Sequence, residues 1–91
     1  MSSKYLINDN YYYDIARRNI KRYRISRRLT QQALADLTGL TRDYICDIES
    51  LKKNKGFSIA TLARIACALG IDIRDLLDDK LENEIIKETI H

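Results

Sequence analysis

The sequence predicts a single all-α domain, and three observations support that prediction. The chain has 91 residues, a length typical of one domain. It contains no proline, so no position forbids a helix. Its glycines, Gly39, Gly56 and Gly70, lie between segments whose apolar residues recur at helical spacing, which is where helix ends are expected.

The first helix is predicted from about Tyr11 to Arg27. Its apolar residues recur at intervals of three and four, and they are Tyr12, Ile15, Ala16, Ile20 and Tyr23. Asn10 stands in front of them as a suitable N-cap. Residues 1–10 are polar and mixed and are expected to form an N-terminal arm.

Two short helices are predicted between Thr30 and Ser50. Thr30 and Thr41 are favourable N-caps, and apolar residues follow each at helical spacing. These are Ala33, Leu34 and Leu37 after the first cap, and Tyr44, Ile45 and Ile48 after the second. Only Gly39 and Leu40 separate the first helix from the cap of the second. A connection this short makes the two helices cross steeply.

A fourth helix is predicted from its cap Ser58 to Gly70, and a short fifth begins after the cap Asp72. The inner face of the fourth is expected to carry Ile59, Leu62, Ala63, Ile65, Ala66 and Leu69. Cys67 is expected to be a small core residue. The predicted domain therefore occupies residues 11–79. Residues 80–91 form a tail that is a candidate dimerisation helix.

Charge is uneven along the chain, although the net charge is only +3. Residues 1–28 carry a balance of +6, residues 29–57 are neutral, and residues 58–91 carry −3. A clustered basic face attracts phosphates irrespective of base sequence, so the pattern favours nucleic acid as a partner. Two interpretations of Arg17, Arg18, Lys21 and Arg22 stay open: a solvated helix face, or attraction to DNA or another partner.

The sequence argues against several function classes. The single histidine is terminal, and the two cysteines lie 21 positions apart, so no metal site, cofactor site or catalytic cluster is expected. No secretory signal or membrane-spanning segment is visible, which favours a cytoplasmic protein with reduced thiols. No small-molecule effector is indicated.

Residues 30–51, TQQALADLTGLTRDYICDIESL, resemble the Cro/repressor-type (XRE) helix-turn-helix family of bacterial and phage transcription regulators. The similarity covers roughly residues 15–78 and extends to Ile20 and Arg24 before the motif and to Leu62, Ile65-Ala66, Ala68-Leu69-Gly70-Ile71 and Leu76-Leu77 after it. It implies a compact five-helix, lambda-repressor-like DNA-binding domain and no enzymatic activity. The second helix of the motif is expected to be the recognition helix.

The resemblance also implies roles for individual residues. Base contacts are expected from the outer face of the recognition helix, at Arg42, Asp43, Cys46 and Asp47. Contacts to the DNA backbone are expected from Gln31, Thr41, Tyr44, Ser50, Lys52, Lys53 and Lys55. Arg24 and Glu49 match a buried ion pair. Arg42 is the favoured base reader, because a guanidinium bonds guanine O6 and N7 bidentately, and Asp47 is suited to accept from a cytosine amino group.

Four departures from the family pattern fall in its loops. Arg28 stands where glycine is frequent before the second helix, and Leu51 stands where glycine is usual after Glu49. The loop that follows is about two residues longer than usual and has Phe57 where proline is frequent. These changes place the phosphate contacts of the loop in question.

Simpler explanations compete at several positions. Arg42 at an exposed helix start could be only solvated, and Asp43 suits the first turn because a carboxylate there favours the helix dipole. Cys46 is either a small groove-fitting side chain or an oxidisable one. Lys52 to Lys55 could be an ordinary solvated loop. Tyr11-Tyr12-Tyr13 are better explained by packing and surface exposure than by stacking on bases.

The favoured function is a sequence-specific transcriptional regulator that binds double-stranded DNA, acting more readily as a repressor than as an activator. One recognition helix reads few base pairs, so a homodimer on a palindromic operator is expected. Its interface is predicted at the fifth helix and the tail, through Leu76, Leu81, Ile85, Ile86 and Ile90. The alternative is an antitoxin-like module whose tail binds a partner protein.

Overall fold

The structure, a computed structural model, describes residues 10–52 and 56–80. Within these two ranges the chain forms five α-helices and no strand. They are α1 (Tyr11–Ser26), α2 (Gln31–Thr38), α3 (Arg42–Glu49), α4 (Ile59–Leu69) and α5 (Ile73–Leu76). The predicted all-α fold class and the predicted order of helices are confirmed. The arm, most of the tail and its candidate helix lie outside the described residues.

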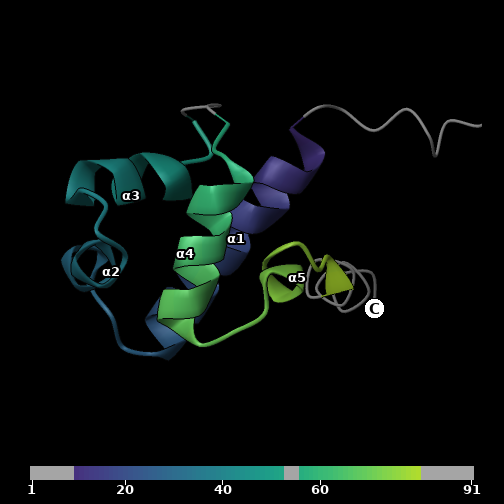
Figure 1. The fold of residues 1–91 in the computed structure, drawn as a ribbon. Coiled ribbons are helices and arrows are strands. Elements are labelled where there is room, and N and C mark those ends of the chain that lie inside the picture. Colours follow the sequence, from purple (N-terminus) through teal and green to yellow (C-terminus); the bar gives the residue numbers. More distant parts are fainter. Residues whose placement is uncertain (1–9, 53–55, 81–91) are drawn as a thin grey trace, which may run out of the picture.

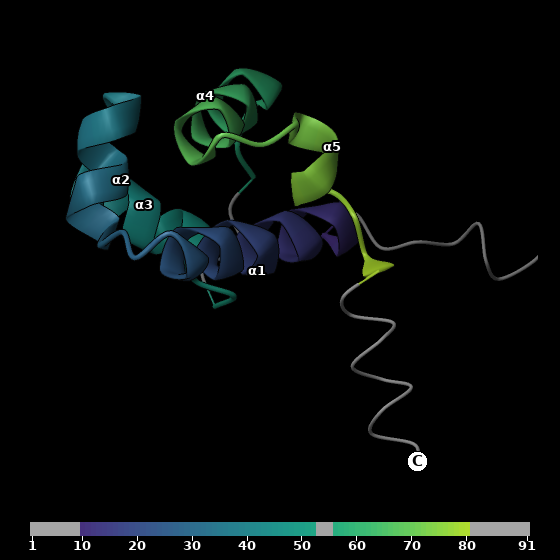
Figure 2. The same ribbon diagram turned by 90° about the horizontal axis from the view of Figure 1, so that it is seen from below.

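The long helix α1 is the element around which the others assemble. It contacts α3, α4 and α5, while α2 packs against α3 and α4. Figure 1 shows α4 lying across α1, with α2 and α3 on one side and α5 on the other. The view from below in Figure 2 shows α1 extended beneath the other helices, with α2 and α3 near its C-terminal half and α5 near its N-terminal end. This arrangement leaves one side of α3 uncovered.

Local residue chemistry explains where most helices begin and end. The side chains of Thr30, Thr41 and Ser58 accept hydrogen bonds from the backbone N–H three residues later, at 3.0, 3.1 and 3.1 Å. Each of these bonds satisfies a donor that the first helical turn leaves unpaired. Gly39 and Gly70 end α2 and α4 with φ angles of 74° and 70°, a left-handed conformation that favours glycine.

The two remaining predicted caps have different outcomes. Asp72 caps α5 and forms a reciprocal capping box with Asp75. The guanidinium of Arg74 also donates to Asp72 and lowers the pKa of that carboxyl. Asn10 occupies the N-cap position of α1, but its backbone is already helical and its side chain makes no cap hydrogen bond, so that predicted cap is wrong.

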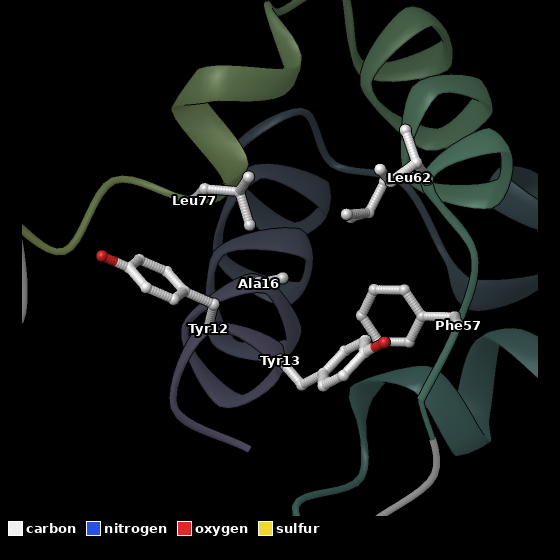
Figure 3. A pocket seen from close by; sticks show the side chains of 7 residues that line it. Tyr12, Tyr13, Ala16, Phe57, Leu62 and Leu77 are labelled. Atoms are coloured by element: carbon white, nitrogen blue, oxygen red, sulfur yellow. The ribbon is translucent and has the colours of Figure 1, made fainter. Parts of the chain in front are cut away.

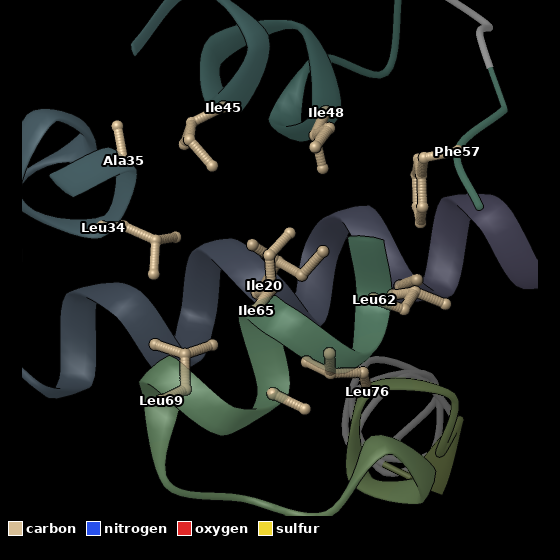
Figure 4. Close-up of a cluster of buried hydrophobic side chains, with 12 residues drawn as sticks. Ile20, Leu34, Ala35, Ile45, Ile48, Phe57, Leu62, Ile65, Leu69 and Leu76 are labelled. Atoms are coloured by element: carbon tan, nitrogen blue, oxygen red, sulfur yellow. The ribbon is translucent and has the colours of Figure 1, made fainter. Parts of the chain in front are cut away.

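The core lies where α1, α3 and α4 meet, as Figure 4 shows for the side chains of Ile20, Ile45 and Ile65. Leu34 and Ala35 close it from α2, and the other buried apolar residues of the cluster are Ala16, Ile48, Phe57, Leu62, Ala66, Leu69 and Leu76. Phe57 comes from the segment before α4 rather than from a helix. The same core therefore fixes the inner face of α3.

Four apolar residues that the sequence places at helical spacing, on an inner face or in the core are exposed. Ile59 is 77% exposed, and Leu37, Ala63 and Cys67 are also exposed. The buried stripe of α4 is Leu62, Ile65, Ala66 and Leu69. Ala63 and Cys67 each lie one position beyond a member of that stripe, and Ile59 begins the helix, where a neighbouring turn exists on one side only. The prediction that Cys67 is a core residue is therefore wrong.

Arg28, in the turn between α1 and α2, has a φ angle of +56°. A side chain with a Cβ is disfavoured there by roughly 1–2 kcal/mol. We expect Arg28→Gly to raise the free energy of unfolding by roughly 0.5–1 kcal/mol, because the relieved strain exceeds the added freedom of the unfolded chain. Urea denaturation measures the change. Arg28→Ala is the matched control, since it removes the guanidinium but keeps the Cβ; equal stability of the two variants would contradict the strain explanation.

Candidate nucleic-acid interface

The connection between α2 and α3 is tight and internally bonded. The buried hydroxyl of Thr38 donates to the carbonyl oxygens of Leu34 and Ala35, at 2.8 and 3.0 Å. The backbone N–H of Leu40 donates to Ala35 at 3.2 Å. These bonds and the left-handed Gly39 fix the angle at which the chain enters α3. Helix α3 is thus held as a rigid unit relative to α2.

Helix α3 has two chemically different faces. Ile45 and Ile48 are buried and point into the core (Figure 4). Arg42, Asp43 and Cys46, which the sequence assigned to base contacts, are exposed, and Asp47 is half-buried. A two-turn helix with one face in the core and a polar opposite face has the size and orientation that suit the major groove of DNA.

The residues expected to meet the DNA backbone lie near the start of α2 and both ends of α3. Thr41 is exposed at the N-terminus of α3, and Tyr44 is half-buried against the core cluster. Half-buried Ser50 ends α3 and accepts from the backbone N–H of Lys52, at 3.3 Å. Lys52 is exposed, whereas Lys53 and Lys55 lie outside the described residues.

Gln31 begins α2 and is joined to the end of α3. Its amide nitrogen donates to the Glu49 carboxylate at 3.3 Å. The side chain is half-buried rather than extended freely into solvent. This bond holds the amide of Gln31 beside the N-terminus of α2, a position with favourable potential for a phosphate.

Arg24 and Glu49 form a bidentate ion pair between α1 and α3. The Arg24 Nε and Nη2 atoms lie 2.6 and 2.9 Å from the two carboxylate oxygens. Only 11% of the Arg24 side chain and 3% of the Glu49 side chain are exposed. Arg24 Nη1 also donates to the carbonyl of Leu29, at 2.8 Å, so one guanidinium joins α1, the following turn and α3.

Arg17 is the site residue that sequence reasoning missed. Both open interpretations placed it at the surface, yet it is only 1% exposed. Its guanidinium donates to the carbonyl oxygens of Asp47 and Ile48, at 3.1 and 2.7 Å. The available signal was its spacing: Arg17 precedes Ile20 by three residues and Arg24 by seven, so all three share a helical face. Its neighbours Arg18 and Lys21 are exposed and Arg22 is half-buried.

The surface expected to form a dimer interface is described only in part. Leu76 is fully buried in the core of its own chain, so its side chain is not at the surface where the sequence placed it. Leu81, Ile85, Ile86 and Ile90 lie outside the described residues. Tyr11 donates to the carboxylate of Asp79 at 2.8 Å, which places the start of the tail beside the N-terminal end of α1.

An open apolar pocket of about 210 Å³ lies near that position. Figure 3 shows Tyr12, Tyr13 and Ala16 of α1 facing Phe57, Leu62 and Leu77 across it. In residues 10–52 and 56–80, no three metal-binding side chains gather, and no helix is long and apolar enough to span a membrane.

Comparison with known proteins identifies the family. The helix-turn-helix family model HTH_3 matches residues 20–76, more than half of the chain. The chain is 41% identical over 69 residues to the immunity repressor protein of Bacillus phage phi105, covering 76% of this chain and 44% of that protein. It is 35% identical over 72 residues to the control protein C.SmaI of Serratia marcescens, covering 78% of this chain and 83% of that protein.

Solved structures show the same fold. A hypothetical transcription factor, NHTF, from Neisseria superposes with a TM-score of 0.71 at 24% identity, covering 82% of this chain and 84% of that one. The restriction-modification controller protein C.AhdI from Aeromonas hydrophila superposes with a TM-score of 0.64 at 28% identity, covering 70% and 94%. The similarity inferred from residues 30–51 is thereby confirmed, and the chain belongs to the HTH_3 helix-turn-helix family of DNA-binding transcription regulators.

Proposed function

We propose that this protein is a cytoplasmic repressor that binds a palindromic operator in double-stranded DNA as a homodimer. The observation that carries the proposal is the two-faced α3, whose apolar side is fixed in the core while Arg42, Asp43 and Cys46 stand exposed on the other side. Two relatives of the chain have names in keeping with this function: an immunity repressor protein and a control protein.

Base readout is assigned to the outer face of α3. Arg42 is the first residue of the helix, so its guanidinium can enter the major groove and bond guanine O6 and N7. Asp47, five residues later, can accept from a cytosine amino group. Asp43 and Cys46 lie between them along the helix. Arg42 therefore supplies attraction to DNA, and the carboxylates restrict which bases are accepted, because each needs a donor to offset its repulsion from phosphates.

Phosphate contacts fix the register of α3 in the groove. We assign them to Gln31 and Thr41 at the two helix starts, to Tyr44 in the first turn of α3, and to Ser50 and Lys52 after its last turn. Lys53 and Lys55, which follow in the sequence, are assigned the same role. The bond from Gln31 to Glu49 supports the assignment, since it holds the amide at the N-terminus of α2.

A homodimer gives the specificity that one short helix lacks. Two recognition helices on a palindrome, with half-sites about 34 Å apart, double the number of bases read. The exposed Ile59 and the apolar pocket beside Leu77 support an interface at the α5 side of the domain, where the tail residues Leu81, Ile85, Ile86 and Ile90 follow. Because occupying an operator blocks transcription without a further surface, repression suits a domain of this size.

Selection from a random duplex library at near-physiological salt tests the function. Enrichment of a palindrome, with two chains per duplex in the sized complex, is the expected result. Enrichment of a single asymmetric site on one chain would contradict the homodimer but keep sequence-specific binding. Weak, salt-sensitive binding without any enriched sequence would contradict operator recognition and favour a protein-binding module, for which recovery of a bound partner from the native cell is the next measurement.

Arg42→Ala is expected to abolish the preference for one base pair, at the same position in each half-site. A bidentate contact of this kind contributes roughly 1–3 kcal/mol of discrimination against the wrong base. Affinities for the selected site and for single-base variants of it measure the effect. Arg64→Ala, which removes an exposed arginine of α4, controls for the lost charge. If Arg42→Ala lowers the affinity for every sequence by the same factor, as Arg64→Ala should, Arg42 reads no base.

A further inference from the structure

We propose that Arg17 is a positioning residue that sets how α3 lies against the domain and thereby how well its outer face fits the bases. Arg17 is buried inside the domain and does not itself reach the DNA-facing side of α3. The proposal rests on the function proposed above, because it concerns the same recognition helix, and it adds a residue outside the helix-turn-helix motif.

Arg17 supplies hydrogen-bond donors and positive charge at the C-terminal end of α3. The last carbonyl groups of an α-helix have no partner within the helix, and they carry the negative end of its dipole. In the final turn of α3, Arg17 donates to the carbonyl of Ile48 and also to that of Asp47, which accepts a second hydrogen bond from the backbone N–H of Ser50 at 3.2 Å. A buried cation at this place donates hydrogen bonds to these carbonyl groups and offsets the partial negative charge at the end of α3.

The rest of the Arg17 side chain is clamped by its surroundings. Its guanidinium carbon lies 5.3 Å from the centre of the Phe57 ring, and its Nε atom lies 3.9 Å from a carboxylate oxygen of Asp14. Tyr13 holds the Phe57 ring edge-on, with the ring centres 5.1 Å apart. A planar guanidinium can stack on a ring while it donates in its own plane, which a lysine ammonium cannot do.

Arg17 and Arg24 together give α3 two anchors on one helix. They lie seven residues apart, which places them on the same face of α1, two turns from each other. Arg24 holds the side chain of Glu49, whereas Arg17 holds the backbone of the preceding two residues. The burial of Ile45 and Ile48 holds the inner face of α3, and the two arginines add contacts that hold its last turn against α1. Since α3 has only 8 residues, a small rotation displaces Cys46 and Asp47 relative to the bases.

Arg17→Met tests the proposal, with Arg64→Met as the matched control that also replaces one arginine by methionine. We expect Arg17→Met to lower affinity for the selected operator roughly tenfold, while affinity for a random duplex changes no more than it does in the control. Arg17→Lys retains the charge, and it is expected to lower operator affinity by a similar factor because an ammonium cannot stack on the Phe57 ring while it donates to the carbonyls of α3. Should Arg17→Met fail to fold, the lysine variant provides the same comparison.

Native-state amide hydrogen exchange gives a readout that needs no DNA. The proposal requires the amides of α3 to exchange faster in the Arg17 variants while those of α4 keep their rates. Parallel acceleration in both helices would overturn it, because Arg17 would then support the whole domain rather than α3. Unchanged operator affinity despite selective acceleration in α3 would overturn it too. If the unmodified protein selects no DNA sequence, the proposed function fails, and hydrogen exchange still decides whether Arg17 positions α3.

Discussion

Glu49→Ala is expected to lower the free energy of unfolding by about 3–5 kcal/mol, because it leaves the Arg24 guanidinium buried without its carboxylate. Both charges are almost withdrawn from water, and the pair makes two short hydrogen bonds. Glu49 also accepts from Gln31, so the substitution loosens the start of α2 together with the end of α3. Single domains are stable by roughly 5–15 kcal/mol in total, so this loss brings the protein close to unfolding at physiological temperature.

Urea denaturation followed by far-ultraviolet circular dichroism measures this loss. The control is a double-mutant cycle with Arg24→Met, Glu49→Leu and the combination of the two. Since replacing a whole buried ion pair by apolar groups is often neutral or stabilising, the double variant should regain most of the stability that each single variant loses. Additive losses in the double variant would show that the two side chains act separately, contrary to the short contacts in the structure.

The boundaries of the helices could be predicted because their causes are local. A threonine or serine hydroxyl satisfies a donor three residues away, and a glycine adopts a left-handed conformation within a single residue. The caps at Thr30, Thr41 and Ser58 and the ends at Gly39 and Gly70 follow directly from these short-range effects. Asn10 is the exception, since having a capping side chain does not oblige a residue to use it.

The buried polar contacts could not be predicted, because their partners are distant in sequence. The side-chain amide of Asn19 donates to the carbonyls of Leu76 and Asp78, at 2.9 and 3.0 Å, across 57 and 59 positions. Arg17 likewise reaches across 30 and 31 positions to the end of α3. On a helix rich in arginine, composition favours a solvated face, and only the packed structure shows that Arg17 lies inside.

For the polar face of α3, the exposure of the side chains could be predicted from the sequence, but their base contacts could not. The helical periodicity places Ile45 and Ile48 on one side, so exposure of Arg42, Asp43 and Cys46 follows from the pattern alone. Base contacts depend in addition on a partner surface that the sequence does not contain. The roles of these side chains therefore come from the family resemblance and from the geometry of the major groove, not from periodicity.

Leu76→Ala is expected to lower the free energy of unfolding by about 2–5 kcal/mol, the usual loss when a fully buried leucine is truncated to alanine. The sequence interpretation places Leu76 in a dimer interface, because the apolar positions of the fifth helix and the tail are expected to be exposed. In the structure Leu76 belongs to the central cluster, while Asn19 bonds its carbonyl oxygen from α1. The side chain and the backbone of Leu76 therefore both tie α5 to the rest of the same chain.

Measurements at several protein concentrations separate the two roles of Leu76. If Leu76 belongs to the core, the loss of stability has the same size at every concentration, and sedimentation of the folded variant matches that of the unmodified protein. Leu77→Ala is the matched control, because Leu77 is half-buried, lines the open pocket and stands one residue away. Leu77→Ala should lower the free energy of unfolding less than Leu76→Ala does. It should weaken self-association more. The opposite assignment, with Leu76→Ala stable but dissociated, would return Leu76 to the interface and would mean that α5 packs differently in the assembled protein.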